Sequence, residues 1–165
     1  LEAHTPDTCR VVRCMPNTPA LVQRGASAYS RGSRATDDDA RLTHSLLEAV
    51  GLAYELPESL INTVTGVSGS GPAYAFLIIE ALAEGGVREG LPQDVALALA
   101  AQTLLGAATM VTTTHTHPAE LREAVSSPGG TTVAALASLE KNHLREALIE
   151  AVRVAKNRAD ELGQS

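Results

Sequence analysis

The segment AVSSPGGTT (Ala124–Thr132) concentrates hydroxyl groups and glycines between two segments whose apolar spacing is typical of helices. Gly129 and Gly130, the latter expected in a left-handed backbone, allow several N–H groups to point toward one place. Thr131 and Thr132 then begin a helix, whose N-terminal end carries partial positive charge. This arrangement predicts a binding site for a small anion, in particular a carboxylate. The alternative is an ordinary connection between two helices.

A second glycine-rich run, TGVSGSGPAY (Thr65–Tyr74), does not match the nucleotide-binding motifs. Its glycines follow the pattern G-x-x-G-x-G rather than G-x-G-x-x-G, and no Lys-Ser/Thr pair follows as in a phosphate-binding loop. It also lacks the G-x-S-x-G pattern of a nucleophile elbow. We expect a turn that lets two helices approach closely, or a segment that lines a site.

No metal site is expected. His115 and His117 are two residues apart and do not share a helix face, while Asp37–Asp39 lack the spacing of a calcium-binding loop and are explained by helix capping. Cys9 and Cys14 fit neither a metal site nor a disulfide framework, which predicts free thiols in a reducing compartment.

The residues up to 57 mix strand and helix signals. Strands are predicted at Cys9–Met15, Ala26–Ser30 and Ala53–Leu56, where β-branched or aromatic residues are bounded by glycine or proline. Thr36 is the predicted N-cap of a helix that Gly51 ends. Strand, helix and strand in this order indicate the last part of a doubly wound α/β sheet, which gives a domain of residues 1–57.

Residues 58–165 are predicted to be all-helical, so the fold class is mainly α. Ser70 is expected to cap a helix that runs to Gly90, and helices begin after Pro92 and Pro118. The helix after Pro92 is apolar around most of its circumference from Val95 to Val111, more than one small domain can cover. We therefore expect a homo-oligomer, at least a dimer.

Composition limits the possible partners. The formal net charge of −6 argues against nucleic acid. No apolar run is expected to reach the ~20 residues of a membrane span, and we predict a cytoplasmic protein without membrane partners. The chain begins with Leu, and its first residues have the pattern of a domain interior, which predicts a fragment.

Five segments together resemble the pyrroline-5-carboxylate reductase family. They are MPNTPALVQRGASAY, TGVSGSGPAYAF, EALAEGGVREGLP, AAQTLLGAATM and HPAELREAVSSPGGTT, and the similarity extends from about Arg10 to Leu162. The resemblance implies an incomplete Rossmann-like domain that binds NADPH or NADH, followed by a helical dimerisation domain that binds substrate. The G-x-G-x-x-G fingerprint is absent, so the 165 residues alone are expected to be inactive and the choice of cofactor to be set elsewhere.

The resemblance also implies the reaction, which is reduction of 1-pyrroline-5-carboxylate to L-proline. The substrate carboxylate would bind the loop amides, with Ser127, Gly129, Gly130 and Thr131 lining the site. The hydroxyl of Thr132 would contact the ring nitrogen during hydride transfer, which makes Thr132 the expected catalytic residue. Binding and orientation would supply most of the rate, because a protonated imine accepts hydride without a strong base.

Two residues outside the loop are also implied by the resemblance. Glu58 matches an acidic position near the substrate, although a carboxylate that begins a helix is the alternative. Asn17 matches a segment near the nicotinamide, with a turn after a strand as the alternative. Ala124 stands at a position that is often polar in relatives, so a cofactor contact is not expected there.

Two other functions remain open. One is a helical dimerisation module without chemistry, which leaves the hydroxyl-rich loop unexplained. The other is a related two-domain hydroxy-acid dehydrogenase, which needs a lysine as acid and base. The only lysines, Lys141 and Lys156, lie late in the chain in polar surroundings.

Overall fold

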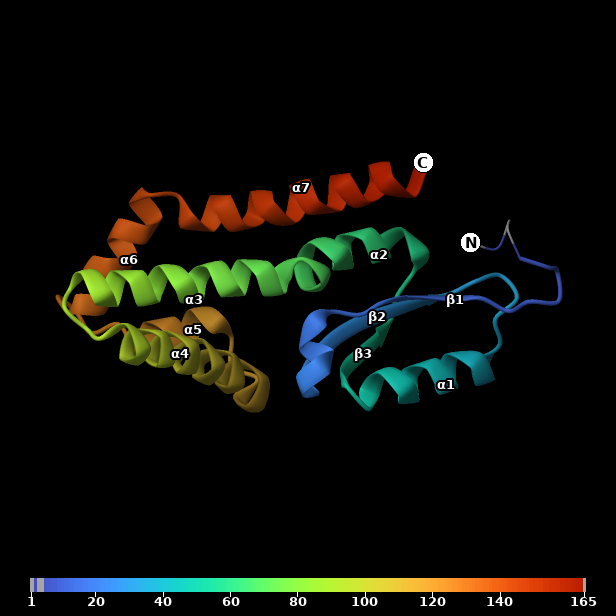
Figure 1. Ribbon diagram of the computed structural model, residues 1–165, viewed down its shortest axis with the longest axis horizontal. Helices are drawn as coiled ribbons and strands as arrows, with labels where there is room; N and C mark the ends of the chain where they lie inside the picture. The colour runs from blue at the N-terminus through green and yellow to red at the C-terminus, as the bar shows by residue number, and fades with distance from the viewer. Residues whose placement is uncertain (1, 3–4, 165) are drawn as a thin grey trace. The chain divides into compact units, whose positions relative to one another are not determined.

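The computed structural model describes residue 2 and residues 5–164, and its elements are labelled in Figure 1. They form two compact units: Leu1–Ala73 with Ile149–Ser165, and Tyr74–Leu148. The first unit contains a small three-stranded sheet with helices, and the second contains helices alone. This confirms the predicted mainly α fold class. The two predicted domains, residues 1–57 and 58–165, are separated by their secondary structure, whereas the two units are separated by compactness. The compact units therefore do not test the predicted domains, which stay a prediction.

The sheet of the first unit has the order β1-β2-β3. Strand β1 (Val12–Met15) is shorter than predicted and pairs antiparallel with β2 (Gly25–Arg31) after the 3₁₀ turn η2 (Thr18–Val22). Strand β3 (Gly51–Glu55) pairs parallel with β2. Figure 1 shows α1 on one face of the sheet and α2 on the other.

Helix α1 (Asp37–Glu48) begins as predicted. The Thr36 hydroxyl accepts from the Asp39 N–H, and the Asp39 carboxylate accepts from the Thr36 N–H, which together form a capping box. Its predicted end at Gly51 is wrong, because the helix ends at Glu48 and Gly51 begins β3. Gly51 has a φ of +153°, and a Cβ there would overlap the backbone of Gly25 on the neighbouring strand.

Helix α2 (Glu58–Val64), the π-helical turn η3 (Thr65–Gly69) and helix α3 (Gly71–Arg88) follow one another directly. The predicted turn between two helices is therefore wrong, because the glycine run continues the helix through a π turn. The expected close approach is present at one glycine. A Cβ on Gly66 would stand 2.5 Å from the Val152 carbonyl oxygen of α7.

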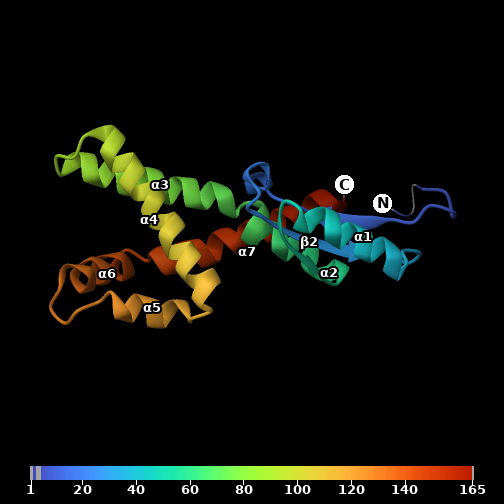
Figure 2. The same cartoon turned by 90° about the horizontal axis from the view of Figure 1, so that it is seen from below.

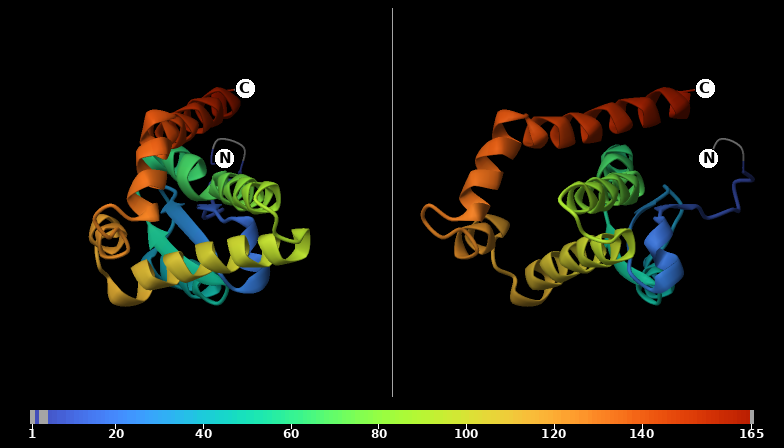
Figure 3. Two further views of the ribbon diagram at one scale, coloured as in Figure 1. Left: turned by 90° about the vertical axis from the view of Figure 1, so that its left-hand side faces the viewer. Right: turned by 60° about the vertical axis from the view of Figure 1, so that its left-hand side comes forward.

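The second unit holds most of α3, α4 (Gln93–Thr114), α5 (Pro118–Ala124), α6 (Thr131–Lys141) and the first turn of α7 (Leu144–Gln164). Figure 3 shows α3 and α4 as neighbours joined by a short connection. They pack through the small side chains of Ala83, Ala96 and Ala100 with Ile79 beside them. The predicted helix starts after Pro92 and at Pro118 are confirmed.

Helix α4 leaves large apolar side chains uncovered in the single chain: Val95, Leu97, Leu99, Leu105 and Met110 are each at least 41% exposed. By length and composition, α4 and the helical stretch Glu58–Arg88 are both apolar enough to cross a membrane, so the expectation that no run is long enough is wrong. Core helices of globular proteins pass the same test, and the finding alone places neither helix in a bilayer.

Candidate functional site

A loop joins α5 to α6 (Figure 2), and a tight turn lies within it. The Gly130 N–H donates to the Ser127 carbonyl at 3.0 Å. The left-handed residue is Gly129, with φ +70°, whereas Gly130 has φ −81° and ψ 171°. The expectation of a left-handed Gly130 is therefore wrong. The space at Gly130 is small, because a Cβ there would overlap the Ser127 hydroxyl in its present position.

The N-terminus of α6 is free of side-chain caps. Gly130 is the N-cap, and the first α-helical bond runs from the Ala134 N–H to the Gly130 carbonyl. The amides of Thr131 and Thr132 therefore have no acceptor within the helix, as is general for a first helical turn. Thr131 is exposed and Thr132 is half-buried. Free amides, two hydroxyls and the positive end of a helix dipole can together bind a carboxylate.

Glu58 lies in the first turn of α2, in the first unit. Its carboxylate forms an ion pair at 2.5 Å with Arg13 of β1, and the same guanidinium donates to Asn62 at 2.8 Å. These contacts give the Glu58 carboxylate a structural role at the start of α2, and the predicted contact with substrate stays a prediction. Sequence reasoning missed Arg13, although a charged residue inside the β-branched run of a strand was a signal that it has a partner.

The Arg13 contacts extend to α7. The Asn62 amide donates to Asp160, and Lys156 pairs with the other Asp160 oxygen at 2.5 Å. The Lys156 ammonium, together with the Asn62 amide, lowers the pKa of Asp160 below its usual value. This network borders a hollow of about 940 Å³. Because Lys156 is paired with a carboxylate, the structure offers no support for it as the acid and base of a dehydrogenase.

Asn17 uses both ends of its carboxamide within the first unit. Its amide group donates to the Ser68 carbonyl of the π turn at 3.0 Å, and its oxygen accepts from the Ala26 N–H at 2.9 Å. The structure thus gives Asn17 two backbone partners, and the predicted cofactor contact stays a prediction.

The two neighbouring histidines, His115 and His117, which were not expected to form a metal site, take structural roles. His117 Nδ1 accepts from the Ala119 N–H at the start of α5, and His115 is the left-handed C-cap of α4. Within residue 2 and residues 5–164, no group of three or more His, Cys, Asp or Glu side chains gathers to hold a metal. Cys9 and Cys14 are free thiols.

The structure brings five predicted site residues together in the second unit and leaves two in the first. The five are Ser127, Gly129, Gly130, Thr131 and Thr132, all in the turn before α6 or in the first turn of α6. The two are Asn17 and Glu58, which contact the π turn and β1 respectively.

Comparison with known proteins gives one consistent result. Residues 58–162 match the family model for pyrroline-5-carboxylate reductase dimerisation. A pyrroline-5-carboxylate reductase of Arabidopsis thaliana is 53% identical over 156 residues, which are 94% of this chain and 56% of that protein. One from Synechocystis is 50% identical over 154 residues, which are 93% of this chain and 58% of that protein.

Solved structures agree. A pyrroline-5-carboxylate reductase from Coxiella burnetii is 44% identical with a TM-score of 0.90, over 94% of this chain and 58% of that one. A pyrroline carboxylate reductase of Plasmodium falciparum, with NADP bound, is 32% identical with a TM-score of 0.92, over 98% of this chain and 62% of that one. The chain spans between half and two thirds of the length of these relatives.

Proposed function

Because this chain belongs to the pyrroline-5-carboxylate reductase family, we propose that it forms part of an enzyme that reduces 1-pyrroline-5-carboxylate to L-proline, the last step of proline biosynthesis. The observation that carries the proposal is the turn before α6. Its glycines and the uncapped start of α6 provide amides for the substrate carboxylate, beside the half-buried Thr132. A helical dimerisation module without chemistry would not need this arrangement.

In this proposal, residues of the chain bind and orient the substrate. The free amides of Thr131 and Thr132 hold the carboxylate and fix the ring, and the Thr132 hydroxyl hydrogen-bonds the ring nitrogen. The substrate imine is protonated, so its carbon accepts a hydride and its nitrogen becomes a secondary amine. The reaction therefore needs no strong general base, and orientation by the loop is the contribution that this chain makes.

NADPH or NADH supplies the hydride when bound. The residues of this chain do not fit the cofactor phosphates, because the glycine run is a π-helical turn and no G-x-G-x-x-G pattern is present. We therefore propose that the phosphate-binding residues belong to a part of the enzyme beyond these 165 residues. The pyrroline carboxylate reductase of Plasmodium falciparum has NADP bound, which supports this type of cofactor.

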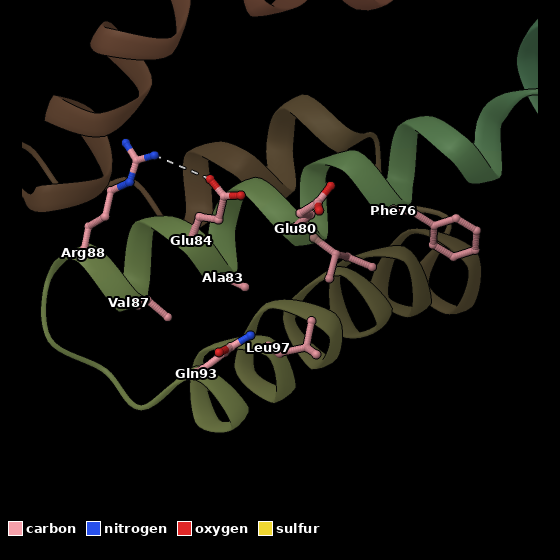
Figure 4. A pocket seen from close by; sticks show the side chains of 9 residues that line it. Phe76, Glu80, Ala83, Glu84, Val87, Arg88, Gln93 and Leu97 are labelled. Atoms are coloured by element: carbon pink, nitrogen blue, oxygen red, sulfur yellow. Dashed lines mark ion pairs between the residues drawn. The ribbon is translucent and has the colours of Figure 1, made fainter.

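The proposed enzyme is a homo-oligomer built on a dimer. Helices α3 and α4 border a hollow of about 820 Å³, lined by apolar side chains such as Phe76 and Leu97 and by the polar side chains of Glu80, Glu84, Arg88 and Gln93 (Figure 4). A second copy of the chain would cover the exposed side chains of α4, and burying a leucine contributes about 1.5–3 kcal/mol. A stable folded monomer at micromolar concentration in light scattering would contradict this assembly. We place the enzyme in the cytoplasm, without membrane or nucleic-acid partners.

Titration with L-proline tests the site directly. In amide NMR spectra of the chain, we expect proline to shift the resonances of residues 129–132, and a neutral analogue without the carboxylate to leave them unchanged. Reductase assays complete the test. Full-length polypeptide should oxidise NADPH or NADH in the presence of 1-pyrroline-5-carboxylate, and the 165 residues alone should not. An active 165-residue chain would contradict the assignment of the cofactor site.

A further inference from the structure

The π turn leaves one backbone carbonyl without its usual donor. The Ser70 N–H donates to the Thr65 carbonyl at 2.8 Å, which is an i to i+5 bond. The carbonyl of Ser68 would accept from residue 72 in an α-helix, but Pro72 has no N–H. The next donor, the Ala73 N–H, bonds to Ser70 instead. A buried or half-buried carbonyl without a partner is unfavourable, so the Ser68 carbonyl needs a donor from elsewhere.

Asn17 supplies that donor from 51 positions earlier in the chain. Its amide group donates to the Ser68 carbonyl at 3.0 Å, while its oxygen accepts from the Ala26 N–H at 2.9 Å. These two partners fix the orientation of the carboxamide. In the flipped orientation, the NH₂ group would face the Ala26 N–H and the oxygen would face the Ser68 carbonyl, so neither hydrogen bond could form. Asn17 is also the N-cap of η2, yet its side chain makes no capping bond there.

The π turn is closely packed on two further sides. Gly66 lies against the Val152 carbonyl of α7, and a Cβ on Gly69 would be 3.4 Å from the sulfur of Met15. The turn also continues directly from α2, whose first residue is Glu58. A change in the turn would therefore move the helix that carries Glu58. π turns inside α-helices are found frequently at functional sites.

We propose that Asn17 is a positioning residue of the reductase, which completes the π turn in place of the N–H that Pro72 lacks and does not contact the cofactor through its carboxamide. The effect of Asn17 on the reaction rests on the proposed function. The hydrogen bond from Asn17 to Ser68, which the missing N–H of Pro72 makes necessary, is independent of the proposed function. Asn17 acts through the turn and through α2, and both ends of its side chain are committed to the backbone.

Two substitutions test the link between Asn17 and Pro72. Asn17→Asp keeps the shape and the acceptor but turns a carboxylate oxygen toward the Ser68 carbonyl, so the donor is lost. Pro72→Ala returns an N–H to position 72, where it can donate to Ser68. We expect Asn17→Asp to lower the Tm of the chain by about 3 °C, and Pro72→Ala to recover at least half of that loss in the double variant. Asn142→Asp is the matched control, because the Asn142 amide donates to a helix carbonyl at an exposed position.

Kinetics of the full-length polypeptide separate positioning from cofactor contact. We expect Asn17→Asp to lower kcat/KM for 1-pyrroline-5-carboxylate about tenfold with an unchanged KM for NADPH or NADH, and Pro72→Ala to restore part of the loss. A raised KM for the cofactor, an unchanged Tm and no effect of Pro72→Ala would overturn the proposal. If Asn17→Asp does not fold, the neutral Asn17→Ser takes its place. Because the Tm comparison needs no activity, it tests the hydrogen bond from Asn17 to Ser68 separately from the reaction that the enzyme catalyses.

Discussion

Replacing Gly130 by alanine tests whether the turn before α6 is shaped for a ligand. The backbone of Gly130, with φ −81° and ψ 171°, suits any residue, so Gly130→Ala introduces no backbone strain. The new Cβ would overlap the Ser127 hydroxyl and stand 3.0 Å from the Ser127 carbonyl oxygen. The hydroxyl can rotate away, whereas the carbonyl is held by its bond from the Gly130 N–H. Overpacking of this kind costs about 1 kcal/mol when a flexible group can move.

The expected loss in binding is larger than the loss in stability. The displaced Ser127 hydroxyl and a shift of the first α6 amides would weaken the contacts to the substrate carboxylate. A hydrogen bond to a charged group contributes about 1.5–3 kcal/mol, so we expect KM for 1-pyrroline-5-carboxylate to rise about tenfold or more. The Tm should fall by no more than about 4 °C. Steady-state rates and thermal unfolding of the full-length polypeptide measure both quantities.

Gly129→Ala is the matched comparison in the same turn. Its φ is +70° and the space around its Cβ position is open, so its cost is one of backbone conformation, about 1–2 kcal/mol. We expect Gly129→Ala to lower the Tm more than Gly130→Ala does, and Gly130→Ala to raise KM more. In the Gly130→Ala background, Ser127→Ala removes the overlapping hydroxyl and should recover stability but not KM. A Gly130→Ala enzyme with unchanged KM and unchanged Tm would refute the reasoning.

Three other outcomes are expected. Thr132→Ala should lower kcat/KM about tenfold or more with an unchanged Tm, and Thr131→Ala should lower it less, as steady-state kinetics will measure. Gly66→Ala should lower the Tm in circular dichroism, because overlap with an α7 carbonyl, about 1–3 kcal/mol, outweighs a gain in helix propensity of about 1 kcal/mol. Hydrogen bonds from the Thr36 N–H and hydroxyl lower the pKa of Asp39 below its usual value. This stabilisation is therefore present above the unfolded pKa and lost as pH falls through the folded one. Thr36→Ala keeps the N–H and removes the hydroxyl, so it should reduce that dependence in part, as urea unfolding at several pH values will measure.

Local signals predicted much of the fold. The cap at Thr36 and the prolines at 92 and 118 each act within one helical turn, and each marked a helix start that the structure contains. The turn before α6 was also predicted from its own residues. Its one error concerned which glycine is left-handed. That depends on the backbone of the turn, which the bond from the Gly130 N–H to the Ser127 carbonyl closes, and composition does not reveal it.

Contacts between distant positions were not predictable from a single sequence. The glycine run was expected to be a turn, because nothing nearby shows that Asn17, 51 positions away, supplies the missing donor to Ser68. The pairing of Arg13 with Glu58 spans 45 positions and was missed for the same reason. Gly51 was predicted to end a helix. Its close approach to Gly25 arises from the pairing of β3 with β2, and the residues near Gly51 do not indicate that pairing.

The first unit has a consequence for synthesis, because it is assembled from two segments that the second unit separates in the sequence. Its last part, Ile149–Ser165, is translated after all 75 residues of the second unit, Tyr74–Leu148. Until then, the Gly66 side of the π turn lacks its cover from α7, and Asn62 lacks Asp160, its partner 98 positions later. On the ribosome, β2, α1 and β3 can pair early because they are neighbours in sequence. The first unit can be completed only after α7 has emerged from the ribosome. It therefore stays incomplete in the nascent chain while the whole second unit is synthesised.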